Sequence, residues 1–214
     1  MSITYYALIV DDSGSMSPFI DKTLSLVDEY VKGACADHTE TGEAARLSLL
    51  TFDTTVKEIC RSVTPDNVPA LTKENYGRGG MTALNDAIGK VISDIAPQAG
   101  KDDRALIVII ADGQENASKE FTTRAIRDLI VAKERDENYT FVYLGAHADA
   151  FAEAAKYGVL CGNSLMFSGS NTEAIGSALN QTRSVYTKSF TSKSSSFVSS
   201  AGDDFKKAGG ETAG

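Results

Sequence analysis

The chain has 214 residues and a formal net charge of −8 at neutral pH, with 42% hydrophobic and 23% charged residues. These values are ordinary for a soluble globular protein, and the length allows one large domain with a three-layer core. The excess of acidic residues and the lack of a basic run argue against binding to nucleic acid or to an anionic membrane through phosphate contacts.

The first expected element is a buried parallel strand over residues 5–10, because a short apolar run there ends abruptly in polar residues. The loop that follows carries Asp11, Ser13 and Ser15 on alternate residues, so their oxygens can converge on one point. A carboxylate and two hydroxyls suit a hard cation such as Mg²⁺. Taken alone, this spacing fits a polar turn that caps the next helix even better.

A helix is expected after Ser17 and Pro18, with apolar residues at three-to-four spacing up to Ala34. His38 then falls in a stretch that we interpret as an exposed polar loop. Residues 46–52 and 56–63 follow as two strands joined by a turn of only three residues, which predicts an antiparallel hairpin.

The segment 64–81 contains two prolines and three glycines and predicts a long irregular connection. It carries Arg78, a candidate partner contact, and it presents Thr82 at the start of a helix that extends to Ile95. A second continuous apolar run, Arg104–Ala111, stops at Asp112 and Gly113. Two buried strands that each end in an aspartate predict neighbours in one parallel sheet, with both carboxylates at the edge where open α/β sheets bind ligands.

Beyond Asp112, Glu115 and Asn116 lie in a polar loop at the same edge, where they could support the site or simply cap a helix. A further helix and a buried strand, residues 140–144, lead to His147, which we interpret as a structural residue or a hydrogen-bonding neighbour of the site. A short helix, an edge strand at 165–167 and a last helix complete the expected domain, residues 1–190. Residues 191–214 are rich in Ser, Gly, Ala and Lys and predict a flexible tail.

Asp11, Ser13, Ser15, Thr82 and Asp112 together form the pattern of a metal-ion-dependent adhesion site. Around them, the stretches DDSGSM, RGGMTALNDAIG, IIADGQENAS and FVYLGAHADAFAEAAKYG resemble the von Willebrand factor A (vWA) family, specifically a subgroup of bacterial and phage proteins. The resemblance covers roughly residues 3–190. It implies a Rossmann-like, three-layer, doubly wound α/β fold with a mostly parallel six-stranded sheet and one antiparallel edge strand.

The resemblance also implies that Ser13, Ser15 and Thr82 bind Mg²⁺ by hydroxyl, with Mn²⁺ or Ca²⁺ as alternatives, while Asp11 and Asp112 bind it directly or through water. Asp12 joins Arg78, Glu115, Asn116 and His147 as a candidate supporting or partner-contacting residue. Neutral hydroxyls do little to quench a divalent charge, so the ion should attract an Asp or Glu of a partner protein.

We therefore expect a protein-binding module that is not an enzyme. One alternative is a Mg²⁺-dependent hydrolase or phosphotransferase, but the chain has no G-x-S-x-G elbow, no phosphate-binding G-x-x-x-x-G-K-[ST] loop and no D-x-D after the first strand. The other alternative is a structural or scaffold protein with a structural metal.

Three scattered cysteines, Cys35, Cys60 and Cys161, give no disulfide pattern and favour a reducing compartment. The amino terminus lacks the charged and apolar regions of a signal peptide. No apolar stretch approaches the ~20 residues of a membrane span. The expected location is the cytoplasm.

Overall fold

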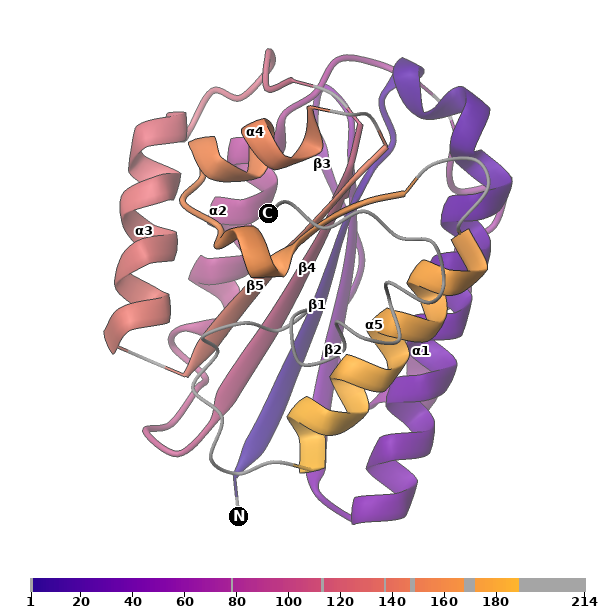
Figure 1. The fold of residues 1–214 in the computed structure, drawn as a ribbon, viewed down its shortest axis with the longest axis vertical. Coiled ribbons are helices and arrows are strands. Elements are labelled where there is room, and N and C mark those ends of the chain that lie inside the picture. Colours follow the sequence, from indigo (N-terminus) through magenta and orange to yellow (C-terminus); the bar gives the residue numbers. More distant parts are fainter. Residues whose placement is uncertain are drawn as a thin grey trace.

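A computed structural model describes residues 2–77, 79–112, 114–136, 138–146, 149–167 and 172–188 of the protein. These residues form six strands and five α-helices, which alternate along the chain except that the third strand follows the second directly (Figure 1). The strands are β1 (Ile3–Asp11), β2 (Ala44–Phe52), β3 (Val56–Val63), β4 (Arg104–Ala111), β5 (Tyr139–Gly145) and β6 (Ser164–Met166). The α-helices are α1 (Ile20–Thr41), α2 (Leu84–Ile95), α3 (Thr123–Asp136), α4 (Ala150–Lys156) and α5 (Thr172–Lys188).

The six strands form one sheet in the order β3-β2-β1-β4-β5-β6. All neighbours pair in parallel except β2 and β3, which form the antiparallel hairpin at one edge, as the sequence predicted. The chain leaves β1 toward β2 on one side and later returns to β4 on the other. This reversal of strand order places a topological switch point at the carboxyl ends of β1 and β4.

Alternation along β1 divides the core into two layers, because successive side chains of a strand point to opposite faces. Tyr6 and Leu8 pack with α1 and α5 on one face, whereas Ala7 and Ile9 pack with α2, α3 and α4 on the other. Figure 1 shows this arrangement, with α1 and α5 on one side of the sheet and α3 on the opposite side. The fold is therefore the three-layer, doubly wound α/β fold expected from the sequence.

Helix α1 differs from the expectation. The residues after β1 first form a 3-10 helix, Gly14–Phe19, with Pro18 inside it, and α1 then continues through the expected loop at residue 38 as far as Thr41. His38 is half-buried, and its Nδ1 lies 2.5 Å from the carbonyl oxygen of Glu43. The helix ends where Gly42 takes a left-handed conformation (φ 64°) and donates its N–H to the carbonyl of His38.

A buried ion pair joins α1 to α5. Asp37 accepts a hydrogen bond from Nη1 of Arg183, and both side chains are almost fully buried. The Arg183 guanidinium also lies over the ring of Tyr30, 5.5 Å from its centroid. Gly33 makes room for it, because a Cβ there would lie only 2.1 Å from Arg183 Nη2.

Within the described ranges, no helix is long and apolar enough to cross a membrane. The expected tail, residues 191–214, lies outside the described residues.

Candidate metal centre

The carboxyl ends of β1 and β4 bring four of the five expected ligands into one hydrogen-bonded row. Asp11 ends β1, and its Oδ1 accepts the N–H of Ser13 at 2.8 Å. The Oγ atoms of Ser13 and Ser15 lie 3.0 Å apart, and Ser15 Oγ donates to Oδ1 of Asp112 at 2.7 Å. Asp112 directly follows β4, so the two neighbouring strands place both carboxylates at the same edge of the sheet. The row therefore spans the switch point.

The loop that carries Thr82 is bound to the loop after β1 by its backbone. The N–H of Gly14 donates to the carbonyl of Gly80, and the N–H of Gly79 donates to the carbonyl of Asp12, both at 3.2 Å. Thr82 itself is 3% exposed at the start of α2. These bonds fix the fifth expected ligand beside the serine loop.

Asn116 and Glu115 hold Thr82 and α2 from the third loop. Asn116 Oδ1 accepts the N–H of Thr82 at 2.8 Å, and the N–H of Asn116 donates back to the carbonyl of Thr82 at 3.0 Å. Glu115 accepts the N–H of Asn85 at the first turn of α2, two backbone N–H groups of its own loop and the Ser118 hydroxyl. Asn116, which is exposed, thus holds the backbone of Thr82, and Glu115, which is half-buried, holds the first turn of α2.

Asp12 and Tyr76 support the backbone below the serine loop. Asp12 Oδ1 accepts the N–H of Gly77 at 2.5 Å. The hydroxyl of Tyr76, a residue that is 1% exposed, donates to the backbone carbonyl of Asp11 at 2.7 Å. The sequence analysis missed Tyr76, because it lies in the irregular segment 65 residues from Asp11 and no local pattern marks it.

The approach of the Thr82 loop to the β2–β3 turn requires a glycine at position 80. Gly80 has φ 141°, and a Cβ there would lie 2.9 Å from Cβ of Asp53. Asp53 forms the turn as expected, with its Oδ1 accepting the N–H of Thr55 at 2.8 Å. Its carbonyl accepts the N–H of Ala83 at 2.7 Å, so the hairpin also anchors the start of α2.

The electrostatics of Asp11 are those of a carboxylate that lacks a counter-charge. Burial, reinforced by the neighbouring Asp112 carboxylate, raises the pKa of Asp11 to about 6, although its hydrogen bonds with Ser13 oppose the shift. Its Oδ2 is buried and accepts no hydrogen bond from any described residue. Such an oxygen is costly to bury unless a cation or a donor reaches it.

The donor set fits a hard divalent cation. Carboxylate and hydroxyl oxygens converge here, and the described part of the chain contains no group of three or more His, Cys, Asp or Glu side chains placed to hold a metal. Soft metals, which select thiolates and imidazoles, therefore match this set less well than Mg²⁺ or Mn²⁺. Two further candidates, Arg78 and His147, lie outside the described residues.

Comparison with known proteins identifies the family. Residues 4–137 match the family model described as "VWA domain containing CoxE-like protein". The chain belongs to the vWA family. No curated protein sequence gives a significant match.

Several solved structures share the vWA fold. One is a von Willebrand factor type A protein from Catenulispora acidiphila, with TM-score 0.59 and 14% identity over 87% of this chain and 43% of the other. Another is proximal thread matrix protein 1 from the mussel byssus, described with a zinc-occupied MIDAS motif, with TM-score 0.64 and 15% identity over 84% and 47%. The vWA2 paralog of ArnB from Sulfolobus acidocaldarius gives TM-score 0.52 and 16% identity over 85% and 45%. This vWA chain spans about half the length of these structures.

Proposed function

We propose that this vWA protein binds a divalent cation through Asp11, Ser13, Ser15, Thr82 and Asp112, and that the bound ion recognises an Asp or Glu of a partner protein. The observation that carries the proposal is the row of carboxylate and hydroxyl groups at the switch point, with Asp11 Oδ2 buried and unpaired among the described residues. The zinc-occupied motif of the mussel byssus protein supports a divalent cation. Mg²⁺ is the proposed ion, because all the donors are oxygens.

The proposed ligands differ in their exposure to solvent, which defines an inner side and an open side of the site. Asp11, Ser13 and Thr82 are buried and form the inner side of the site, whereas Ser15 is exposed and Asp112 is half-buried. The open side therefore faces solvent at Ser15 and Asp112. The ion, when bound, would offer a coordination position at this opening, because Mg²⁺ prefers octahedral geometry and tends to keep waters that an incoming carboxylate can replace.

We propose binding instead of catalysis. The two carboxylates of the row are the proposed ligands themselves, and Glu115 has both oxygens occupied by four donors, so none of the three is available as a general base. The proposal includes a cytoplasmic location, in keeping with the free thiols of Cys35 and Cys60.

Metal binding is tested first, by thermal denaturation with and without Mg²⁺ or Mn²⁺. An ion that binds only the native state raises the free energy of unfolding by about 2.7 kcal/mol at a hundredfold excess over its Kd. The wild type and the exposed control Asp102→Ala should both show the rise, and Asp11→Ala should lose it. An equal rise in Asp11→Ala would overturn the assignment of the site.

Partner recognition is then tested by affinity purification from the host in Mg²⁺ and in EDTA, with Asp11→Ala as a parallel bait. A protein retained only by the wild type in Mg²⁺ is purified, and its affinity is measured with each exposed Asp and Glu replaced in turn. The proposal predicts that one such replacement weakens binding as much as EDTA does. Affinity that is unchanged in EDTA would show that the ion has only a structural role.

A further inference from the structure

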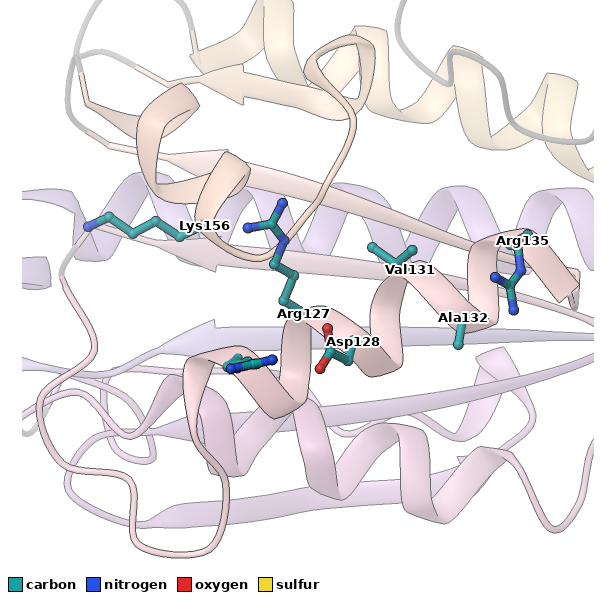
Figure 2. Close-up of a pocket in the computed structure, with 7 residues that line it drawn as sticks. Arg127, Asp128, Val131, Ala132, Arg135 and Lys156 are labelled. Atoms are coloured by element: carbon teal, nitrogen blue, oxygen red, sulfur yellow. The ribbon is translucent and has the colours of Figure 1, made fainter.

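Helix α3 and the end of α4 form a basic groove on the outer face of the molecule, distinct from the metal centre. Its volume is about 870 Å³. Besides Ala132, its lining consists of Arg124, Arg127, Asp128, Val131, Arg135 and Lys156. Figure 2 shows Arg127, Val131 and Arg135 along α3, with Lys156 of α4 beyond the Arg127 end of this row. We refer to these six residues as the α3 groove.

The α3 groove follows one stripe of the helix. Its α3 residues recur at intervals of three or four positions, the spacing of one helix face. Ile126 and Ile130 lie on the other face and are completely buried against the sheet. At 1.5 Å of rise per residue, Arg124 and Arg135 are about 16 Å apart along the axis. That span matches about five residues of an extended peptide.

The charge of the α3 groove is opposite to that of the whole chain. It contains four basic residues and one acidic residue, in a protein of net charge −8. Lys156 is already paired with Glu153 at 2.5 Å. Within the described part of the chain, Arg124 and Arg127 have neither a hydrogen bond nor an ion pair from their side chains. Two exposed guanidinium groups are therefore available to an anionic ligand, and guanidinium binds carboxylates in bidentate geometry.

The floor of the α3 groove is apolar and tightly built. Val131 is 44% exposed, and only Met81 and Leu160 share this degree of exposure among the large hydrophobic residues described. Gly158 lies against it, since a Cβ there would be 2.9 Å from Val131 Cγ2 and 3.3 Å from Arg127 Cγ. Because Gly158 has φ 75°, a side chain at this position would also be strained. Val131 thus remains exposed to solvent on α3, between Arg127 and Arg135.

We propose that the α3 groove binds an acidic peptide segment of a partner protein, with one apolar residue seated on Val131 and carboxylates on one side of that residue bound to Arg127 and Arg124. A peptide fits better than a nucleic acid for two reasons. The exposed valine offers a contact for an aliphatic side chain, and the groove has no aromatic residue on which a base could stack. The acidic remainder of the chain repels a long polyanion but tolerates a short segment held at close range.

Fluorescence anisotropy tests the proposal with a labelled peptide of about seven residues, all Glu or Asp except a central Leu. The measurement uses the full chain in about 50 mM salt, where exposed charges are weakly screened. EDTA is present throughout, so the metal centre cannot hold the peptide. Saturable binding by the wild type is expected under these conditions, and its absence in EDTA would overturn the proposal.

Two variants, each with two charge reversals, distinguish binding at the α3 groove from an effect of the protein's net charge. Arg124→Glu with Arg127→Glu should raise the Kd about tenfold or more, because each exposed pair is lost and replaced by repulsion. Lys101→Glu with Lys119→Glu gives the same net charge on exposed residues elsewhere and should leave the Kd within about twofold. Equal weakening by both pairs would overturn the site.

The apolar contact and the class of ligand are tested with the same assay. Val131→Ser should weaken the Leu peptide but not a peptide with Gln in its place. An equal effect on both peptides would contradict the role of Val131. Tighter binding of a single-stranded oligonucleotide of equal charge, lost on reversal of Arg124 and Arg127, would identify a nucleic acid as the ligand and overturn the peptide proposal.

Discussion

Ser15 and Asp112, 97 residues apart in the chain, are joined by a 2.7 Å hydrogen bond from the serine Oγ to the aspartate Oδ1. The bond closes the row that begins at Asp11, and it lies on the exposed side of the site. Ser15 is thus bonded to a candidate ligand on each side, Ser13 and Asp112. It is the hydroxyl whose removal tests the metal centre with least disturbance of the core.

We expect Ser15→Ala to weaken Mn²⁺ binding by about 10-fold or more, because it removes one of the five proposed ligands, and loss of a residue that only orients a ligand already costs about 10–100-fold. Isothermal titration calorimetry measures the affinity. Ser17→Ala is the matched control, because Ser17 lies in the same 3-10 helix and its hydroxyl, among the described residues, donates to the carbonyl of Gly14 and to no candidate ligand. Equal losses in the two variants would mean that the change acts through the 3-10 helix and not through a ligand.

Two buried tyrosines should respond differently to loss of their hydroxyls. Tyr76→Phe leaves the carbonyl of Asp11 without its donor and should lower the free energy of unfolding by about 1–3 kcal/mol. Tyr30 has a buried hydroxyl with no hydrogen-bond partner among the described residues, so Tyr30→Phe should leave stability unchanged or raise it. Urea denaturation measures both. A larger loss in Tyr30→Phe than in Tyr76→Phe would contradict this account.

Glu134 should make stability depend on pH. Burial raises its pKa to about 7 in the folded protein, from an ordinary value of 4.5, although its Oε1 accepts the N–H of Phe141. A raised folded pKa means that the native state holds this proton more tightly than the unfolded chain. Its contribution to the free energy of unfolding is therefore complete below about pH 4.5 and is lost as the pH rises through about 7.

The variant Glu134→Gln cannot ionise and keeps an acceptor for Phe141. We expect it to gain stability relative to the wild type between pH 5 and pH 8, measured by urea denaturation in EDTA. Glu120→Gln changes an exposed glutamate and serves as the control. A stability difference for Glu134→Gln that does not change with pH would exclude this residue as the source.

Removing only one partner of the ion pair between α1 and α5 should strongly lower the free energy of unfolding. Asp37→Ala leaves the Arg183 guanidinium buried without its carboxylate and should lower the free energy of unfolding by about 3–5 kcal/mol. Asp37→Leu combined with Arg183→Met should cost less than Asp37→Ala alone, because no unpaired charge is left behind. A double-mutant cycle of Asp37→Leu, Arg183→Met and their combination measures the coupling between the two side chains. Purely additive losses of stability would contradict the prediction.

The sequence by itself determined the sheet and the position of Asp11 and Asp112 at one edge of it. The apolar runs before Asp11 and Asp112 predicted two adjacent parallel strands, and β1 and β4 do pair in parallel. The short turn at 53–55 predicted the antiparallel hairpin at the edge. These inferences succeeded because they rest on local periodicity and on short connections, which constrain the chain whatever surrounds it.

Only the tertiary structure decided the contacts between distant segments. Polar residues around His38 resemble a loop locally, yet α1 continues through them because Asp37 finds a buried partner 146 residues away in Arg183. Gly42 marks the true end of the helix and was the available local signal. The support of Asp11 by Tyr76 and of Thr82 by Asn116 has no local signature either. Such pairings depend on how the sheet brings loops together, which periodicity along the chain does not encode.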